Sequence, residues 1–471
     1  MTKIIVWLRQ DLRISDNPAL YEAAKFGKVL PIFILDEAAA GEFKISGAAK
    51  VWLFYSLQNL NKSFAGKINF YQGNAKEILA KIIKENNIAA VYWNRCYEPW
   101  RIKQDSEIKT FLKSQEILVK SFNASLLFEP WQILKSDQTP YKVFTPFYRN
   151  GCLQGQEPRK PISKPSNLDL IKDQNSQDLE NLNLLPTNNW YKKITDNWQI
   201  GENFAQEKLQ NFLKNGLKNY KEGRNFPDKK NVSQLSPHLR FGEISPNQIW
   251  YEAQAYFHDQ NLAKDVDHFL SELGWREFSY YLLYHFPTLP RQNFQKKFDK
   301  FPWSQNLDLF KAWKLGKTGF PIVDAGMREL WQTGYMHNRV RMIVGSFLVK
   351  NLLLHWHLGE NWFWDCLVDA DLANNSASWQ WVAGSGADAA PYFRIFNPIL
   401  QGEKFDPDGN YTRRFVPEIA KLPNKYLFKP WQAPIDILQQ AKIELGKDYP
   451  KPIVDMESSR NAALNSYKQI S

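Results

Sequence analysis

The chain has 471 residues, with 60 Lys and Arg against 49 Asp and Glu, which gives a formal net charge of +11 at pH 7. This length exceeds the roughly 250–300 residues at which a single hydrophobic core stops growing, so two domains are expected. Three widely spaced cysteines exclude a disulfide framework, and no apolar run approaches the roughly 18 residues of a membrane span. We therefore expect a soluble, cytoplasmic monomer that has no membrane partner and whose basic surplus favours a polyanionic one.

The first 125 residues alternate short apolar runs with helical patterns. The strand-like runs lie at 4–8, 29–35, 68–71, 89–93 and 117–122. They are apolar throughout, as strands are when helices cover both faces of a parallel sheet. Asn17 can cap the first helix, which Pro18 would begin. We expect residues 1–125 to form an α/β domain with a doubly wound, five-stranded, Rossmann-like sheet that binds a ligand at the carboxyl ends of its strands.

The periodicity fades between residues 126 and 197, where prolines recur, so this stretch is expected to be an inter-domain linker. Residues 198–471 are expected to form an all-α domain. Its amphipathic runs lie at 204–217, 265–283, 326–333, 338–354 and 362–368.

Several common catalytic patterns are absent from the sequence. The Gly316-Lys317-Thr318 string resembles the end of a P-loop, but Lys311 stands where its first glycine would be. His355 and His357 are two residues apart and would face different directions on a helix, so no metal site is expected. There is also no Gly-x-Ser-x-Gly nucleophile elbow in the sequence.

Five local groups in the helical region combine Trp, Arg, Asn and acidic residues. They lie at 231–237, 272–278, 336–342, 369–375 with 379–381, and 388–398. Ser236 is expected to cap a helix whose start could hold a pyrophosphate. Helical spacing gives two shared faces, Glu272 with Trp275 and Arg276, and Asn338 with Arg341 and Met342. Each group alone also fits a salt-bridged helix with aromatic core packing.

Together, the motifs resemble the photolyase and cryptochrome family, most closely its class I cyclobutane pyrimidine dimer photolyases. They are Trp-Leu-Arg-x-Asp-Leu-Arg-x-x-Asp-Asn-Pro-Ala-Leu at 7–20, Leu-Ser-Pro-His-Leu at 235–239, Trp-Arg-Glu-Phe at 275–278, Met-His-Asn-Arg at 336–339, Trp-Gln-Trp at 379–381 and the aromatic turn at 388–398. Their order and spacing agree with the family over nearly the whole chain.

The resemblance implies that the helical domain binds FAD, with the anionic reduced form FADH⁻ as the working state. The residues expected on the diphosphate side are Tyr220, Val232, Ser233, Gln234, Leu235 and Ser236, with Val232 standing where relatives often have a hydroxyl residue. Those expected at the flavin ring are Glu272, Asn338, Arg341, Asp369, Asp371 and Asn375. Asp369 would pair with Arg341, and Asn375 would lie beside flavin N5.

The resemblance also assigns residues to the lesion, the DNA backbone and electron transfer. The catalytic set would be Glu272, Trp275, Asn338, Met342, Asn375 and Trp381. DNA would be held by Arg224, Trp275, Arg276, Arg339, Trp381 and Arg394. Trp379, Trp356 and Trp303 match the family's electron-transfer chain from flavin to surface, although buried tryptophans also serve core packing.

The implied activity is light-dependent repair of cyclobutane pyrimidine dimers in DNA, in which excited reduced FAD donates an electron to a flipped-out dimer. A methenyltetrahydrofolate or an 8-hydroxy-5-deazaflavin is the expected antenna. The alternatives are a cryptochrome-type blue-light sensor, a (6-4) photolyase and a DNA-binding module without cofactor. Asn375 in place of an acid argues against the sensor, and Asn338 and Met342 stand where animal-type (6-4) enzymes have histidines.

Overall fold

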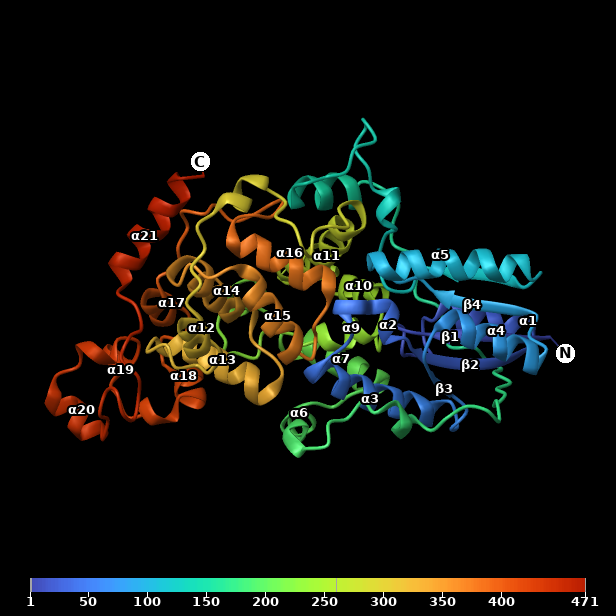
Figure 1. The fold of residues 1–471 in the computed structure, drawn as a ribbon, viewed down its shortest axis with the longest axis horizontal. Helices are drawn as coiled ribbons and strands as arrows, with labels where there is room; N and C mark the ends of the chain where they lie inside the picture. Colours follow the sequence, from blue (N-terminus) through green and yellow to red (C-terminus); the bar gives the residue numbers. More distant parts are fainter. Residues whose placement is uncertain (1, 260, 471) are drawn as a thin grey trace. The chain divides into compact units, whose positions relative to one another are not determined.

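The computed structural model describes residues 2–259 and 261–470 (Figure 1). They form two compact units. The first unit contains Met1–Lys218, Ser233–Pro287 and Val368–Ala373, and the second contains Asn219–Val232, Thr288–Leu367 and Asn374–Ser471. The predicted domain division at residues 125 and 197 rests on sequence composition and stays a prediction.

A five-stranded parallel sheet with the order β3-β2-β1-β4-β5 is the centre of the first unit. The strands are β1 (Lys3–Leu8), β2 (Lys28–Leu35), β3 (Asn69–Gln72), β4 (Ala90–Asn94) and β5 (Leu118–Phe122). Ile5 of β1 lies between Leu30 of β2 and Val91 of β4, and all three side chains are buried. The predicted doubly wound sheet is confirmed, and each strand begins and ends within one residue of its predicted range.

Helices beside the sheet explain why the strands are apolar throughout (Figure 1). They are α1 (Pro18–Phe26), α3 (Gly47–Ser63), α4 (Ala75–Asn86) and α5 (Pro99–Ser114). Leu79 of α4 and Leu112 of α5 share one core cluster with Trp7 and Trp93 of the sheet, while α1 contacts four of the strands. The predicted cap is confirmed, because the Asn17 side chain accepts a hydrogen bond from the Leu20 amide and α1 begins at Pro18.

Residues 126–197 are largely irregular, as their prolines predict, but they are folded onto the first unit. Leu170 forms a parallel bridge with Val29 of β2. A π-helical turn at Pro146–Cys152 contacts α11 (Ala263–His285), where Phe147 lies 5.1 Å from Phe278 between ring centroids. The stretch therefore contributes side chains to the core of this unit.

The remaining chain is helical in both units, as predicted. The first unit also contains α7 (Glu202–Asn215), α9 (Ser236–Phe241) and α10 (Pro246–Gln254). The second unit contains α12 (Leu307–Lys314), α13 (Pro321–Thr333), α14 (Asn338–Ser346), α15 (Trp356–Cys366), most of α16 (Leu372–Ala383), α17 (Pro398–Phe405), α18 (Asn410–Phe415), α20 (Ile435–Ala441) and α21 (Met456–Lys468).

Two helix boundaries in the second unit differ from the predictions. The run at 338–354 is not one regular helix, because α14 passes into a π-helical turn at Phe347–Asn351 and Leu353 then adopts a left-handed conformation with φ 53°. The run at 362–368 begins earlier, at Trp356, because the His355 side chain caps that end by accepting from the His357 amide.

No helix in residues 2–259 and 261–470 combines the length and the apolar character that crossing a lipid bilayer requires.

Candidate functional site

The indole of Trp275 on α11 lies flat against Phe144 in the first unit. The ring centroids are 3.7 Å apart and the planes are inclined by 11°, and Phe144 in turn stacks on Tyr148. Gly274 permits this packing, since a Cβ there would lie 2.5 Å from the Tyr148 ring. The Trp275 indole, which the sequence assigns to the catalytic set, is therefore held on one face by Phe144, and Tyr148 supports Phe144 in turn.

Arg276, the next residue on α11, is held by several groups of the first unit. Its Nη1 donates to the Ser125 carbonyl at 2.8 Å and lies 3.3 Å from a Glu277 oxygen, and its guanidinium lies over the Tyr280 ring. Glu277 is buried and accepts from the Leu127 amide. Burial raises the pKa of Glu277 to about 7 in spite of the neighbouring arginine. Arg276 thus anchors the irregular stretch to α11, and its DNA contact stays a prediction.

The acidic segment 369–371 is bound to helices of the first unit. Asp369 accepts a hydrogen bond from the Ser236 hydroxyl at 2.6 Å, and Asp371 accepts one from the Tyr280 hydroxyl. The Arg240 side chain donates to the carbonyl of Ala370 between them. The prediction that Ser236 caps a helix is wrong, because Leu235 is the N-cap of α9 and the Ser236 hydroxyl is directed to Asp369 instead.

The 233–236 segment makes a tight turn before α9. Gln234 adopts a left-handed conformation with φ 53°, and the Ser233 hydroxyl accepts from the Leu235 amide at 3.4 Å. The turn leaves Ser233 half-buried and Gln234 exposed. Tyr220 and Val232 of the same predicted set belong to the second unit.

In the second unit, arginines surround the start of α14. His337 caps the helix by accepting from the Arg339 amide, and it is buried. Burial, followed by the charges of Arg224, Arg339 and Arg341, lowers the pKa of His337 to about 3. The cap is therefore a neutral imidazole amid guanidinium groups, and the local charge is positive.

The side chains along α14 lie in different environments. Asn338 is exposed and Met342 is half-buried. Arg341 donates to the Met336 carbonyl at 2.7 Å, whereas Arg339 donates to Asn225 and lies over the Phe405 ring. Arg341 and Arg339 thus diverge, as their spacing predicts. The pairing of Arg341 with Asp369 stays a prediction.

Glu360 on α15 fixes the position of α16. The Asn375 amide donates to the Glu360 carbonyl oxygen at 3.0 Å, and the Ser376 hydroxyl donates to the Glu360 carboxylate at 2.6 Å. That carboxylate also lies 3.2 Å from Arg291. Further along α16, Trp379 is buried and Trp381 is half-buried. Glu360 could not be predicted from the sequence, because a single acidic residue among aromatic residues forms no periodic pattern.

The three tryptophans of the expected electron-transfer chain all belong to the second unit. Trp379 packs against α15 at Gly359, where an added Cβ would lie 2.1 Å from the indole. Trp356 is buried and donates from Nε1 to Asn293 at 3.0 Å. Trp303 is half-buried. Exposure therefore rises from Trp379 and Trp356 to Trp303.

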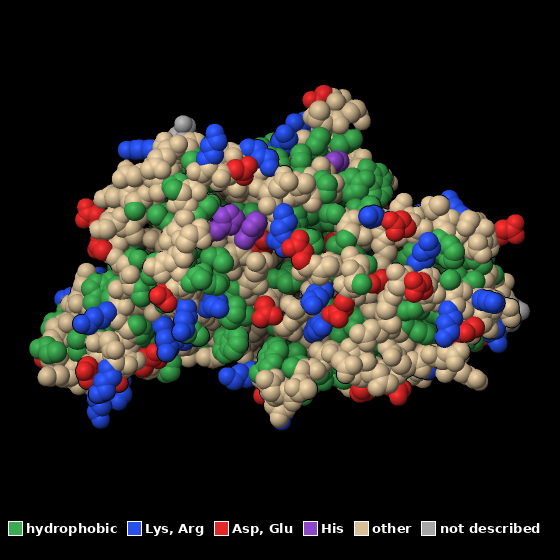
Figure 2. Space-filling view, viewed as in Figure 1, with side chains coloured by type: hydrophobic (Ala, Val, Ile, Leu, Met, Phe, Trp, Pro, Cys, Tyr) green, Lys and Arg blue, Asp and Glu red, His purple; other side chains and the backbone are tan. Residues whose placement is uncertain are grey.

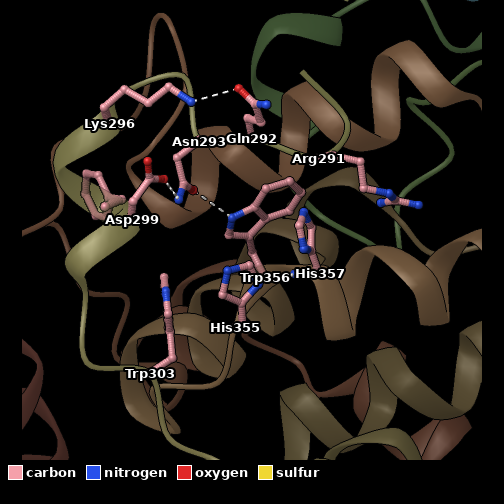
Figure 3. A pocket seen from close by; sticks show the side chains of 10 residues that line it. Arg291, Gln292, Asn293, Lys296, Asp299, Trp303, His355, Trp356 and His357 are labelled. Atoms are coloured by element: carbon pink, nitrogen blue, oxygen red, sulfur yellow. Dashed lines mark hydrogen bonds between the residues drawn. The ribbon is translucent and has the colours of Figure 1, made fainter. Parts of the chain in front are cut away.

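A cavity of about 530 Å³ borders Trp303 and Trp356 (Figure 3). His355 and His357 also line it, with ring centroids 4.6 Å apart. The expectation that these histidines face different directions is wrong, because His355 is the N-cap of α15 and lies outside the helix. The described residues contain no group of three or more metal-ligating side chains.

The remaining predicted cations also lie in the second unit. Arg224 is half-buried over the Tyr220 ring, and Arg394 is exposed in the aromatic turn, where its carbonyl accepts from buried Lys350. Figure 2 shows that Lys and Arg side chains on the visible face are interspersed with acidic ones rather than gathered into one basic stripe.

Two family models match the chain. The model described as DNA photolyase matches residues 4–166, and the model described as the FAD-binding domain of DNA photolyase matches residues 269–469. The narrower prediction of class I membership lacks support, because a similar solved structure carries a different class name.

Curated and solved relatives extend the match to nearly the whole chain. A deoxyribodipyrimidine photo-lyase of Agrobacterium fabrum is 48% identical over 99% of this chain and 98% of its own length. Cryptochrome-2 of Arabidopsis thaliana is 37% identical over 97% of this chain and 77% of its own length. A bacterial class III photolyase from Agrobacterium tumefaciens has a TM-score of 0.96 at 48% identity, covering 100% of this chain and 98% of that one.

These relatives confirm the predicted fold class and the prediction of an enzyme family, since further curated relatives also carry the name deoxyribodipyrimidine photo-lyase. The chain belongs to the DNA photolyase and cryptochrome family.

Proposed function

We propose that this protein is a light-dependent photolyase that repairs cyclobutane pyrimidine dimers in DNA, and that it is of the class III type rather than the predicted class I. The observation that carries the repair function is the Trp275–Phe144 stack beside Glu272 on α11. The class III type is supported by the TM-score of 0.96 and 48% identity to the solved class III relative.

The chemistry of the available donors suits FAD. Ser233 offers a hydroxyl donor for a diphosphate, whereas Ser236 would have to release Asp369 to donate to one. Asn338, Arg341 and Asn375 offer amide and guanidinium groups for the heteroatoms of a flavin. Reduced FAD, when bound, supplies the electron for repair on illumination. The chain binds and orients it, and positive charge near Arg341 favours an anionic form.

Asn375 is the residue we propose beside flavin N5. One of its amide hydrogens is used by the Glu360 carbonyl, so the second hydrogen and the amide oxygen are the groups that a flavin can use. Because Asn375 is neutral, it adds no charge next to an anionic cofactor.

The lesion would be held by a plate and a carboxylate on one helix face. A dimer must leave the duplex to reach a buried cofactor, and it loses less pairing energy than an intact base pair does. Trp275 offers a flat surface that Phe144 keeps in place, and Glu272, one turn before it, can accept hydrogen bonds from base edges. Asn338, Met342 and Trp381 complete the proposed set.

The backbone of the DNA would be held by cations that read no sequence. Arg224 and Arg339 contribute to the positive charge around His337, and Arg394 is exposed, so its guanidinium is accessible to a phosphate. Arg276 joins the proposed set, with the N–H groups that Ser125 and Glu277 do not use.

Trp379, Trp356 and Trp303 would carry electrons inward when oxidised FAD is photoreduced. The greater exposure of Trp303, compared with buried Trp379 and Trp356, supports Trp303 as the surface end of the chain. The antenna pigment remains either a methenyltetrahydrofolate or an 8-hydroxy-5-deazaflavin.

A cytoplasmic location is supported by Cys96, Cys152 and Cys366, which are all free thiols. A monomer is proposed as well.

The testing experiment is illumination of the reduced holoprotein with an oligonucleotide that contains one thymine dimer, followed by chromatography for restored thymines. A matched oligonucleotide with a (6-4) lesion serves as the control. We expect restoration of the dimer substrate alone. Absence of repair, together with a light-dependent spectral change, would instead favour the cryptochrome-type sensor that the 37% identity to Cryptochrome-2 makes the second candidate.

A further inference from the structure

The aromatic turn at 388–398 contacts a buried lysine of the second unit. Lys350 belongs to the π-helical turn Phe347–Asn351, and only 1% of its surface is exposed. Its ammonium donates a hydrogen bond to the Arg394 carbonyl at 3.0 Å and lies 5.3 Å from the centroid of the Tyr392 ring. Lysine is seldom buried without an acidic partner, yet none of the described residues forms an ion pair with this one. Lys350 therefore holds the backbone of the aromatic turn and does not neutralise an acid.

Anchors on both sides of Arg394 fix the path of the turn. Before it, Tyr392 is buried and stacks on Tyr467 of α21, with centroids 4.8 Å apart and planes inclined by 11°. After it, the Phe396 amide donates to the hydroxyl of Ser346, the last residue of α14, at 3.3 Å. Between these two anchors, the hydrogen bond from the buried ammonium sets the orientation of the peptide that follows Arg394.

The outer side of the same turn is open to solvent. Phe393 is 66% exposed, and Arg394 is exposed as well. Arg394 thus offers its guanidinium to the surroundings while its carbonyl oxygen binds Lys350. One residue thereby connects a buried charge with the surface at which the proposed function places a DNA phosphate.

Burial and one neighbouring charge determine the protonation of Lys350. Burial, followed by the positive charge of Arg394, lowers the pKa of Lys350 from the ordinary 10.5 to about 7. Tyr392 adds no charge, because burial raises the pKa of its phenol. The elements packed against the π-helical turn are α14, α15 and α21. Of these, α21 contributes Tyr467, whose phenol accepts from Lys297 at 2.9 Å, and in the described part of the chain no charged side chain of the three helices bonds to Lys350.

We propose that Lys350 positions the aromatic turn for DNA and takes up a proton from solvent when Arg394 binds a phosphate. The proposal rests on the proposed DNA contact of Arg394. A phosphate at the guanidinium offsets the positive charge that disfavours the ammonium, so the protonated lysine becomes more stable in the complex. A charged ammonium also makes a stronger hydrogen bond to the carbonyl than a neutral amine does. Binding of DNA and protonation of the lysine therefore favour each other.

The first test measures the affinity of the holoprotein for a dimer-containing duplex in the dark, from pH 6 to pH 9 at constant ionic strength. Because the lysine is more basic in the complex, the dissociation constant of the wild type should rise by about three- to tenfold over this range. Lys350→Met keeps an unbranched side chain without the charge, so it should bind weakly already at pH 6 and lose most of the rise. Lys421→Met removes one exposed lysine of the same unit and should keep the wild-type pH profile. Equal pH profiles for the wild type and Lys350→Met would overturn the inference.

The second test observes the amine in the wild type and does not require a folded variant. Holoprotein labelled with ¹³C at the lysine Cε is titrated with acid and base by NMR, with and without the duplex. The Lys350 signal is recognised by a midpoint near pH 7, since ordinary lysines titrate near pH 10.4. We expect saturation with DNA to raise this midpoint by about 0.5–1 pH unit, which corresponds to the three- to tenfold change in affinity. The same midpoint in free and bound protein would overturn the inference.

Arg394→Ala separates the inference from the proposed function. The variant should bind the duplex more weakly and should raise the Lys350 midpoint of the free protein, because the neighbouring positive charge is gone. If it binds as tightly as the wild type, the proposed DNA contact of Arg394 fails and the inference fails with it. If it binds more weakly but DNA does not move the wild-type Lys350 midpoint, the inference alone fails. Both measurements are made in the dark, so the yield of repair affects neither.

Discussion

The Trp275 indole and the Phe144 ring lie face to face, 3.7 Å apart between centroids, although 131 positions separate them in the chain. If half-buried Trp275 receives a flipped base as proposed, it would lose affinity when free to tilt, because the cost of ordering the indole would then be met at binding. Phe144 supplies that order in advance.

Phe144→Ala is expected to weaken binding of dimer-containing DNA by about 0.5–1.5 kcal/mol, up to roughly tenfold, because Trp275 loses its stacking partner. The measurement is fluorescence anisotropy of a labelled oligonucleotide with and without the dimer. Phe257→Ala, at an exposed aromatic residue on a 3-10 turn of the same unit, is the control and should change neither affinity. Equal losses for damaged and undamaged DNA would contradict a role in lesion binding.

Glu272→Ala is expected to weaken dimer binding by about 1.5–3 kcal/mol and to lower the repair yield, because a charge-assisted hydrogen bond to the flipped base is lost. Glu272→Gln keeps a hydrogen-bond acceptor, so its dimer affinity and repair yield should lie between those of the wild type and of Glu272→Ala. Affinity and yield are measured on the same oligonucleotide, and unchanged values for Glu272→Ala would remove this residue from the site.

Trp303→Phe is expected to slow photoreduction of oxidised FAD while leaving repair by the pre-reduced protein intact, since only photoreduction needs a donor near the surface. The control is Trp331→Phe, an exposed tryptophan that stacks on Trp362 and does not line the cavity. Absorbance during illumination gives both rates, and equal slowing by the two variants would argue for a general loss of structure.

Asn375→Asp is expected to abolish repair and to change the visible spectrum that the holoprotein reaches under anaerobic illumination. The new carboxyl faces the Glu360 carbonyl, to which the Asn375 amide now donates, and it keeps this contact only when protonated. It then offers a proton, or else a negative charge, to the cofactor. Asn374→Asp is the comparison, and if it alone changes the spectrum the assignment of Asn375 to flavin N5 is off by one residue.

Glu329→Gln is expected to reduce the pH dependence of stability. Buried Glu329 accepts from Tyr411 and from the His337 amide, and burial raises its pKa from the ordinary 4.5 to about 7. Its protonated form is favoured by folding, so this contribution is present in full below pH 4.5 and is lost as the pH rises through about 7. Urea unfolding across that pH range should show the free energy of unfolding of the wild type falling by up to about 3 kcal/mol relative to that of the variant. If the two free energies change with pH in parallel, Glu329 is not the source of the pH dependence.

The strands were predictable because burial on both faces leaves an unbroken apolar run, as in β2. The face that joins Glu272, Trp275 and Arg276 was predictable because helical spacing depends only on local geometry. The contact of Phe144 with Trp275 was not predictable, since Phe144 comes from a stretch without periodicity and meets α11 only after folding.

A partner distant in the chain explains one error, and the exact start of a helix explains another. Ser236 next to a proline has the sequence of an N-cap, but its hydroxyl donates to Asp369, 133 positions away. Helical spacing predicts that His355 and His357 face different directions. His355, however, is the N-cap that precedes α15, so it lies outside the helix and its ring is beside that of His357. Rules for local sequence cannot anticipate a bond partner that another segment supplies.

Gly359 fixes the packing of α15 on α16 and would thereby set the rate of the proposed electron transfer. A methyl group there would overlap the Trp379 ring, so the glycine sets how closely α15, which begins at Trp356, approaches α16. Tunnelling between two aromatic rings falls off exponentially with the gap between them. If Trp356 and Trp379 carry electrons as proposed, a substitution as small as Gly359→Ala would therefore push the two helices apart and widen the gap that the electron crosses.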